Sequence, residues 1–157
     1  MSEMQAFKRV GFLSLLSDED LSGLLACAQR IEFRKDQEIL QQGQSNASLF
    51  VVHEGLLHAR RRSRDRDVFL GRLEAGSFFG ELSLFDPGPT TATVHAVADG
   101  TLLEISRSCL DDFLARHPAA GAQMLRGILK DVSHRLRRAD ERLADAVVWA
   151  GLLRSPE

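Results

Sequence analysis

The residues best suited to chemistry in this 157-residue chain lie between positions 78 and 94. The run Phe79-Gly80-Glu81-Leu82-Ser83 predicts the end of a strand, a glycine turn and one helical turn. The first N–H groups of a helical turn have no partner within the helix, and with the local dipole they favour an anion. Gly80 has no side chain, so a ligand can approach its backbone closely. These residues therefore predict a site for a negatively charged group.

Glu81 would place a carboxylate beside this anion site. A carboxylate repels a phosphate, but it accepts hydrogen bonds from the hydroxyl of a sugar. Thr90 and Thr91 follow a proline-rich loop and offer hydroxyl groups from the facing side. The ligand chemistry that this stretch predicts is therefore an anion with an attached sugar.

The segment that must position these residues, 31–106, consists of short apolar runs separated by turn residues. No helix-length pattern separates consecutive runs, which argues against alternating parallel strands and helices. Asp99-Gly100 predicts a hairpin turn between the last two strands. We therefore predict a mainly β member of the α+β class: an antiparallel β-roll, which is a double-stranded, jelly-roll-like β-helix.

Helices are predicted on both sides of the roll. Residues 18–30 read as an amphipathic helix that Ser17 caps together with Asp20, and Ser106 or Ser108 can cap a second, short helix. A long helix follows from Pro118. Its apolar residues recur at alternating intervals of four and three: Leu125, Leu129, Val132, Leu136, Ala139, Leu143, Ala146, Ala150 and Leu153. This spacing predicts a homodimer seam over residues 125–153, and the alternative is a single helix lying on its own domain.

These residues together resemble the cyclic-nucleotide-binding domain family, in the branch of catabolite-activator-type bacterial regulators. The phosphate cassette of that family reads approximately F-G-E-L/I-A-L, a short loop, and P-R-S/T-A-T-V. Here Phe79-Gly80-Glu81-Leu82-Ser83-Leu84 and Pro89-Thr90-Thr91-Ala92-Thr93-Val94 are similar to it, and the resemblance extends over roughly residues 12–140. It implies one domain over 1–157, divided into a helical part at 1–30, a roll at 31–106 with the cassette at 78–94, and helices at 107–154.

The resemblance also implies roles for individual residues. Gly80, Glu81 and Leu82 would line the ribose-phosphate of cAMP or cGMP, next to Ser83, with Glu81 on the ribose 2′-hydroxyl. Thr91 would lie near the phosphate and the base, and the long helix near Ala139 and Asp140 would close over the base.

The sequence departs from the family pattern at Thr90, where the family has its phosphate-binding arginine. A guanidinium gives a phosphate two charge-assisted hydrogen bonds, whereas a threonine gives at most one neutral bond. Two outcomes stay open: a cyclic nucleotide is still bound, or the ligand is different or absent. Another arginine could substitute, and the candidates are Arg60, Arg62, Arg135 and Arg138.

The remaining composition favours a binding protein over an enzyme. The net charge of −2 does not suit bulk binding of nucleic acid, and Glu81 has no evident acid or base partner for catalysis. The five histidines lack metal-ligand spacing, so no metal or resident cofactor is expected. The two cysteines, Cys27 and Cys109, read as small buried thiols of a cytoplasmic protein.

Three hypotheses follow from these observations. The first is a non-catalytic sensor module that couples ligand binding to its long helix and to a protein partner. The second is a dimerisation or scaffold module with a ligand-deficient pocket. The third is the sensory part of a transcription regulator, for which this sequence shows no DNA-binding segment after the long helix and no membrane span.

Overall fold

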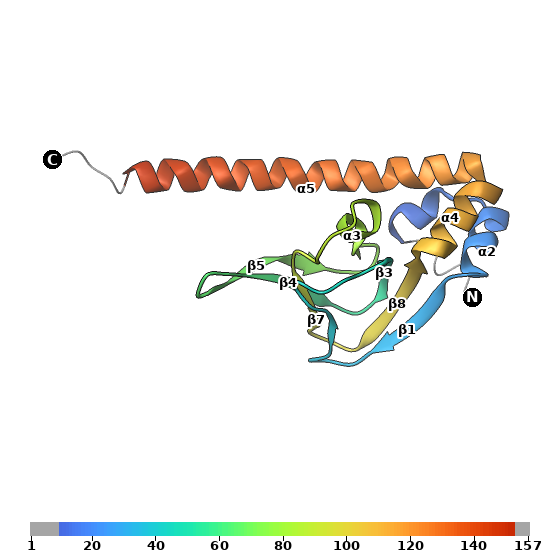
Figure 1. Ribbon diagram of the computed structural model, residues 1–157, viewed down its shortest axis with the longest axis horizontal. Coiled ribbons are helices and arrows are strands. Elements are labelled where there is room, and N and C mark those ends of the chain that lie inside the picture. Colours follow the sequence, from blue (N-terminus) through green and yellow to red (C-terminus); the bar gives the residue numbers. More distant parts are fainter. Residues whose placement is uncertain (1–9, 153–157) are drawn as a thin grey trace.

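A computed structural model describes residues 10–152 of the chain. The elements follow in the order η1 (Gly11–Leu15), α2 (Asp18–Leu25), β1 (Gln29–Phe33), β2 (Glu38–Leu40), β3 (Ser48–Glu54), β4 (Leu57–Ser63), β5 (Arg66–Leu73), β6 (Phe78–Phe79), α3 (Glu81–Phe85), β7 (Thr93–Ala96), β8 (Gly100–Ser106), α4 (Arg107–Arg116) and α5 (Pro118–Leu152). The strands form a roll, and the long helix α5 runs along it. The short helix α3 lies between the roll and α5, and α2 and α4 lie at one end of the roll (Figure 1).

The roll consists of two four-stranded sheets, and every strand pair is antiparallel. One sheet has the order β1-β8-β3-β6 and the other β2-β7-β4-β5. Apolar side chains from both sheets fill the space between them, among them Phe33, Val52, Leu57, Phe79 and Leu102. The predicted antiparallel β-roll with an N-terminal helix and a long C-terminal helix is confirmed.

The hairpin predicted at Asp99-Gly100 is wrong, because β7 and β8 belong to different sheets. The chain passes from one sheet to the other at this corner. Asp99 accepts hydrogen bonds from the backbone N–H of Lys35, at 2.7 Å, and from Arg34 Nη1, at 3.2 Å. Asp99-Gly100 therefore marks a bend in the chain, but the strands on its two sides do not pair with each other: β7 pairs with β2 and β4, and β8 pairs with β1 and β3.

The N-terminal helix is shorter than the sequence indicated. α2 ends at Leu25 rather than near residue 30, because Gln29–Phe33 pairs with β8 as an edge strand. Its cap is as predicted: the Ser17 hydroxyl oxygen accepts from the N–H of Asp20 and donates to the Asp20 carboxylate, at 3.2 and 2.7 Å. Of the two serines proposed for the later helix, Ser106 is the cap of α4, since its hydroxyl oxygen accepts from the N–H of Cys109.

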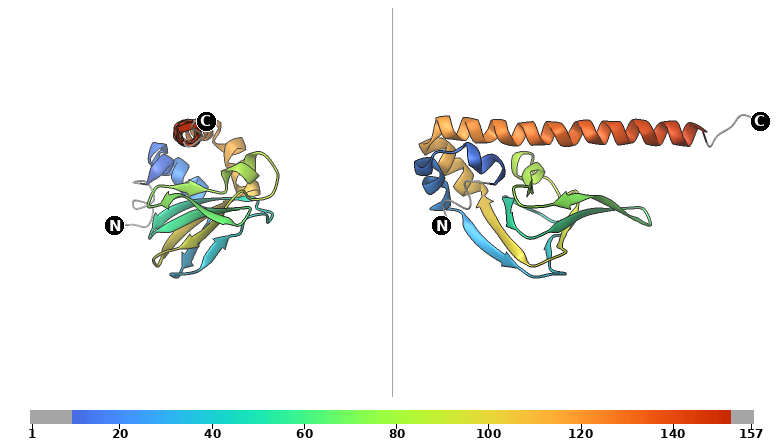
Figure 2. Two further views of the ribbon diagram at one scale, coloured as in Figure 1. Left: turned by 90° about the vertical axis from the view of Figure 1, so that its left-hand side faces the viewer. Right: turned by 180° about the vertical axis from the view of Figure 1, so that it is seen from behind.

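The helices enclose a second apolar cluster. η1, α2, α4 and the beginning of α5 pack together at one end of the roll, as the view from behind shows (Figure 2). On α5 the buried residues are Ala120, Gly121, Met124 and Ile128, all in its first third. Its remainder runs past the roll above the β4–β5 hairpin. Leu153, the last residue of the predicted seam, lies outside the described residues. Within residues 10–152 no helix has the length and apolar character needed to cross a membrane.

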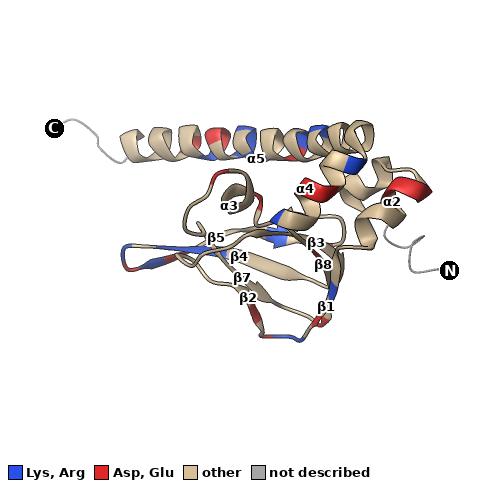
Figure 3. Ribbon diagram, turned by 45° about the vertical axis from the view of Figure 1, so that its right-hand side comes forward, with Lys and Arg blue, Asp and Glu red and all other residues tan. Residues whose placement is uncertain are grey.

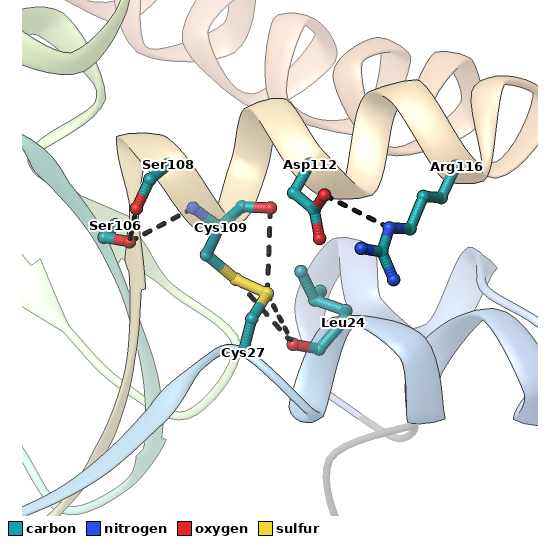
Figure 4. The surroundings of a disulfide bond; sticks show 7 residues. All are labelled: Leu24, Cys27, Ser106, Ser108, Cys109, Asp112 and Arg116. Carbon is teal, nitrogen blue, oxygen red and sulfur yellow. Dashed lines mark hydrogen bonds and ion pairs between the residues drawn. A yellow bond between two sulfur atoms is a disulfide. The ribbon is translucent and has the colours of Figure 1, made fainter.

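The two cysteines form a disulfide, so the prediction of free buried thiols is wrong. Cys27, which is exposed, follows α2, and Cys109 lies in the first turn of α4 (Figure 4). Their Cα atoms are 5.5 Å apart, although 82 positions separate them in the sequence. The sequence analysis missed the pair because only the packing of α2 on α4 brings the two residues together.

Candidate ligand-binding site

The cassette turn is held rigidly by its neighbours. Gly80 has a positive φ of 86°, and a Cβ at this position would lie 2.5 Å from the carbonyl oxygen of Ser48. The Asn46 side chain donates to the carbonyl oxygens of both Ser48 and Gly80, at 2.8 and 3.2 Å. Only glycine fits both the conformation and the space, so the start of α3 is fixed relative to β3.

A cavity of about 930 Å³ lies between the cassette, β5 and α5. Seven of the eight residues predicted for the ligand site line it: Gly80, Glu81, Leu82, Ser83, Thr90, Thr91 and Ala139. The eighth, Asp140, is exposed and does not line this cavity. The tertiary structure thus brings the cassette and the long helix to the same cavity. Of the two helix residues predicted for the site, Ala139 lines this cavity and Asp140 does not.

Glu81 is a buried carboxylate at the wall of this cavity, with 8% of its surface exposed. Burial raises the pKa of Glu81, and the nearby charge of Arg135 opposes that rise. One guanidinium nitrogen of Arg135 lies 3.3 Å from Glu81 Oε1. Both charges are partly removed from water. Loss of one partner would therefore cost more free energy than the loss of a partner from an ion pair at the surface.

Arg135 also contacts the strand before the turn. Its other terminal nitrogen donates to the carbonyl oxygen of Phe78, at 2.5 Å, and its guanidinium lies 4.4 Å from the centre of the Phe78 ring. These contacts extend from the middle of α5 to both sides of the cassette turn. Arg135, one of four arginines considered as substitutes at Thr90, is therefore the one that reaches the cassette.

Thr90 lines the cavity, but its hydroxyl group is engaged within the protein. The hydroxyl donates to the carbonyl oxygen of Gln41 and accepts from the N–H of Gln44, the latter at 3.2 Å. The backbone of Thr90 bonds the same loop through Gln44 and Gly43. Thr90 therefore fastens the loop between β2 and β3 to the cassette, while Thr91 is exposed.

The other candidate arginines divide by location. Arg60 forms an ion pair with Asp67, at 3.7 Å, and lies over the Phe69 ring, and neither Arg60 nor Arg62 lines the cavity. Arg138 does line it, and so does Arg142, whose Nη1 donates to the carbonyl oxygen of Leu70 at 3.4 Å. Arg142 was not among the four candidate arginines. The spacing of Arg135, Arg138 and Arg142 places them on one helix face, but the sequence does not say which face meets the roll.

A metal centre finds no support in the described part of the chain, where no three histidine, cysteine, aspartate or glutamate side chains are grouped to hold an ion. The polar groups at the cavity are instead carboxylates, guanidiniums and hydroxyls, together with the first-turn amides of the short helix α3. This set suits an organic anion with hydroxyl groups.

Comparison with known proteins agrees with this fold. Residues 30–117 match the family model of the cyclic nucleotide-binding domain, and the chain belongs to that family. It is 27% identical over 140 residues to a CRP-like cAMP-activated global transcriptional regulator of Mycobacterium tuberculosis. That match covers 88% of this chain and 61% of the relative, so the chain spans about three fifths of that regulator's length.

Solved structures show the same architecture. The N-terminal domain of a transcriptional regulator from Streptomyces coelicolor A3(2) superimposes with a TM-score of 0.70 at 30% identity, over 88% of this chain and 94% of that chain. The catabolite activator protein of Thermus thermophilus gives a TM-score of 0.76 at 27% identity, over 87% of this chain and 62% of that chain. The resemblance read from the cassette is therefore confirmed at the level of the family and the fold.

Proposed function

We propose that this domain is a non-catalytic sensor that binds a cyclic nucleotide, with cAMP and cGMP as first candidates, in the cavity between the cassette and α5. The observation that carries the proposal is the buried carboxylate of Glu81 at the cavity wall, beside the turn at Gly80. A carboxylate offers about four lone-pair sites, so the contact with Arg135 leaves acceptor capacity for a sugar hydroxyl.

Ligand binding would reach α5 through Arg135. In the structure, this guanidinium joins the middle of α5 to Glu81 and Phe78. A sugar hydroxyl that donates to Glu81 would take up part of the carboxylate's negative charge, weaken its attraction for Arg135, and so change the position that Arg135 prefers. The ligand then favours one placement of the second half of α5 over another, which is the signal that a protein partner would detect.

The same helix would form a homodimer. Leu129, Leu136 and Leu143 are seven residues apart and each is more than 60% exposed. Val132, from the same predicted seam, packs on the apolar cluster that the helices enclose, and Ala139 lines the cavity. We therefore assign the two readings of the seam to different residues: one row meets its own domain, and the other row would pair with the helix of a second copy. The molecular mass in solution, measured by light scattering, tests this pairing.

A second candidate function is a scaffold with a ligand-deficient pocket. The specific observation that favours it is the Thr90 hydroxyl, which already bonds Gln41 and Gln44. Without a guanidinium at this position, the cassette offers a phosphate no positive side chain of its own. A scaffold would dimerise with or without nucleotide.

A third candidate is the sensory part of a transcription regulator. The Streptomyces domain, which this chain covers almost completely, supports it. Sequence-specific binding of duplex DNA in a mobility-shift assay would place this candidate first.

Isothermal titration calorimetry with cAMP and cGMP tests the sensor proposal. We expect the wild-type chain to bind at least one of them, and Glu81→Gln to lower the affinity about tenfold because a charge-assisted bond is lost. Glu74→Gln is the matched control, since Glu74 lines the same cavity but forms an exposed ion pair with Arg72.

No heat with either nucleotide, together with binding by a Thr90→Arg variant, would favour the scaffold. Equal affinity of wild type and Glu81→Gln would contradict the role given to Glu81.

A further inference from the structure

The cavity carries positive charge that the cassette does not use. Six charged side chains line it, and four of them form two ion pairs: Arg135 with Glu81 and Arg72 with Glu74. The other two are Arg138 and Arg142, and neither forms an ion pair with any residue between 10 and 152. The lining therefore has a net charge of about +2.

The geometry of α5 places these two guanidiniums beyond the cassette. Arg138 and Arg142 follow Arg135 by three and seven residues, which corresponds to about 4 and 10 Å along the helix axis. Arg142 reaches across to the β4–β5 hairpin, where it contacts the carbonyl oxygen of Leu70. The positive charge therefore continues from the cassette end of the cavity towards the hairpin.

A cyclic mononucleotide would not use this charge. Its single phosphate belongs at the cassette turn, where Gly80 and Ser83 lie, and its sugar belongs on Glu81. The cavity of about 930 Å³ is near the upper end of ordinary ligand pockets, about 300–1,000 Å³, so a larger ligand has room.

We propose that Arg138 and Arg142 form a second phosphate subsite, and that the preferred ligand is a nucleotide with two phosphate groups. This inference rests on the proposed function, because the ligand occupies the same cavity. A guanidinium binds a phosphate through parallel charge-assisted hydrogen bonds, so these two give a second phosphate the positive charge that the cassette, with Thr90, does not offer the first. The two phosphates can belong to a cyclic dinucleotide or to a linear nucleoside diphosphate.

The test is calorimetry of the 157-residue chain with cAMP, cGMP, cyclic di-GMP, cyclic di-AMP, ADP and GDP. Each titration is repeated on the double variant R138Q/R142Q and on the control R137Q. Arg137 is an exposed arginine of the same helix that does not line the cavity. All three replaced side chains are exposed, and circular dichroism melting verifies that the variants fold.

We expect at least one two-phosphate ligand to bind ten times more tightly than cAMP. The double variant should lose about tenfold in affinity per guanidinium for that ligand and much less for cAMP, and R137Q should resemble wild type. The cyclic and the linear ligands then identify the source of the second phosphate.

Two results overturn the inference in different ways. If cAMP or cGMP binds at least as tightly as every two-phosphate ligand, or if R138Q/R142Q binds them all like wild type, the second subsite is wrong and the sensor proposal stands. If no nucleotide binds wild type at all, both proposals fail.

Discussion

The two ends of α5 meet different surroundings. At its beginning, Met124 is fully buried and Ile128 nearly so, in a cluster with η1, α2 and α4. Towards its end, Leu143 and Trp149 are about two-thirds exposed. Between them, Arg135 and Arg142 are the side chains that tie the helix to the cassette and to the hairpin.

The difference gives the proposed coupling a physical basis, since one part of the helix is anchored and the other is held by weaker contacts. Apolar burial fixes the first part, since about 25 cal/mol is gained for each Å² removed from water. Polar contacts at a half-exposed guanidinium are weaker and depend on what else binds the carboxylate. Most of the charged residues of α5 also lie beyond the anchored turns, from Lys130 onwards (Figure 3). In the sensor that we propose, a ligand at Glu81 would therefore act on the second part without unfolding the first.

Loss of the disulfide should have the largest effect, because it joins the helices that support the anchored part. The bond closes a loop of 82 residues, for which the chain-entropy relation gives about 4 kcal/mol of stabilisation. We expect Cys27→Ser to lower the free energy of unfolding by about this amount in urea titrations. Addition of dithiothreitol should lower the free energy of unfolding of wild type by the same amount and leave that of Cys27→Ser unchanged. Equal urea midpoints for wild type and Cys27→Ser without dithiothreitol would disprove the stabilising role of the disulfide.

Truncation of a buried side chain in the anchored part comes next. Met124→Ala should cost about 3 kcal/mol, because it leaves a cavity in the helical cluster. Leu136→Ala, on the same helix but 61% exposed, should change the stability of the monomer by no more than about 0.5 kcal/mol. Light scattering should show that Leu136→Ala shifts the monomer–dimer equilibrium towards the monomer. Equal destabilisation by Met124→Ala and Leu136→Ala would contradict the division of α5 into an anchored and an exposed part.

The pH dependence of Glu81 is the smallest effect and sharpens the link between the two regions. Burial raises the pKa of Glu81 in the folded protein above its ordinary value of 4.5. The folded protein therefore favours the protonated carboxyl over the carboxylate. The contribution of Glu81 to the free energy of unfolding is complete below pH 4.5 and is lost as the pH rises through the pKa of the folded state. Glu81→Gln should gain stability relative to wild type over that rise, by less than the cost of Met124→Ala. A constant difference between pH 4 and pH 8 would contradict the raised pKa.

The sequence was most reliable where a local pattern has one structural solution. The cassette run predicted the strand, glycine turn and helical turn that β6, Gly80 and α3 form. Ser17 and Ser106 marked their helix starts because a cap acts within three residues. Patterns that depend on distant partners were less reliable, and so α2 was predicted too long and Asp99-Gly100 was assigned to a hairpin.

The amino-acid order by itself thus determined the roll, the position of the cassette and the absence of an arginine at Thr90. Only the tertiary structure decided that Cys27 meets Cys109, that Arg135 contacts Glu81, and that Arg138 and Arg142 border the cavity. The physical reason is that turns, caps and periodicity act over a few residues. The rotation of a long helix about its axis, and the pairing of residues far apart in the chain, are fixed by apolar packing summed over the whole molecule.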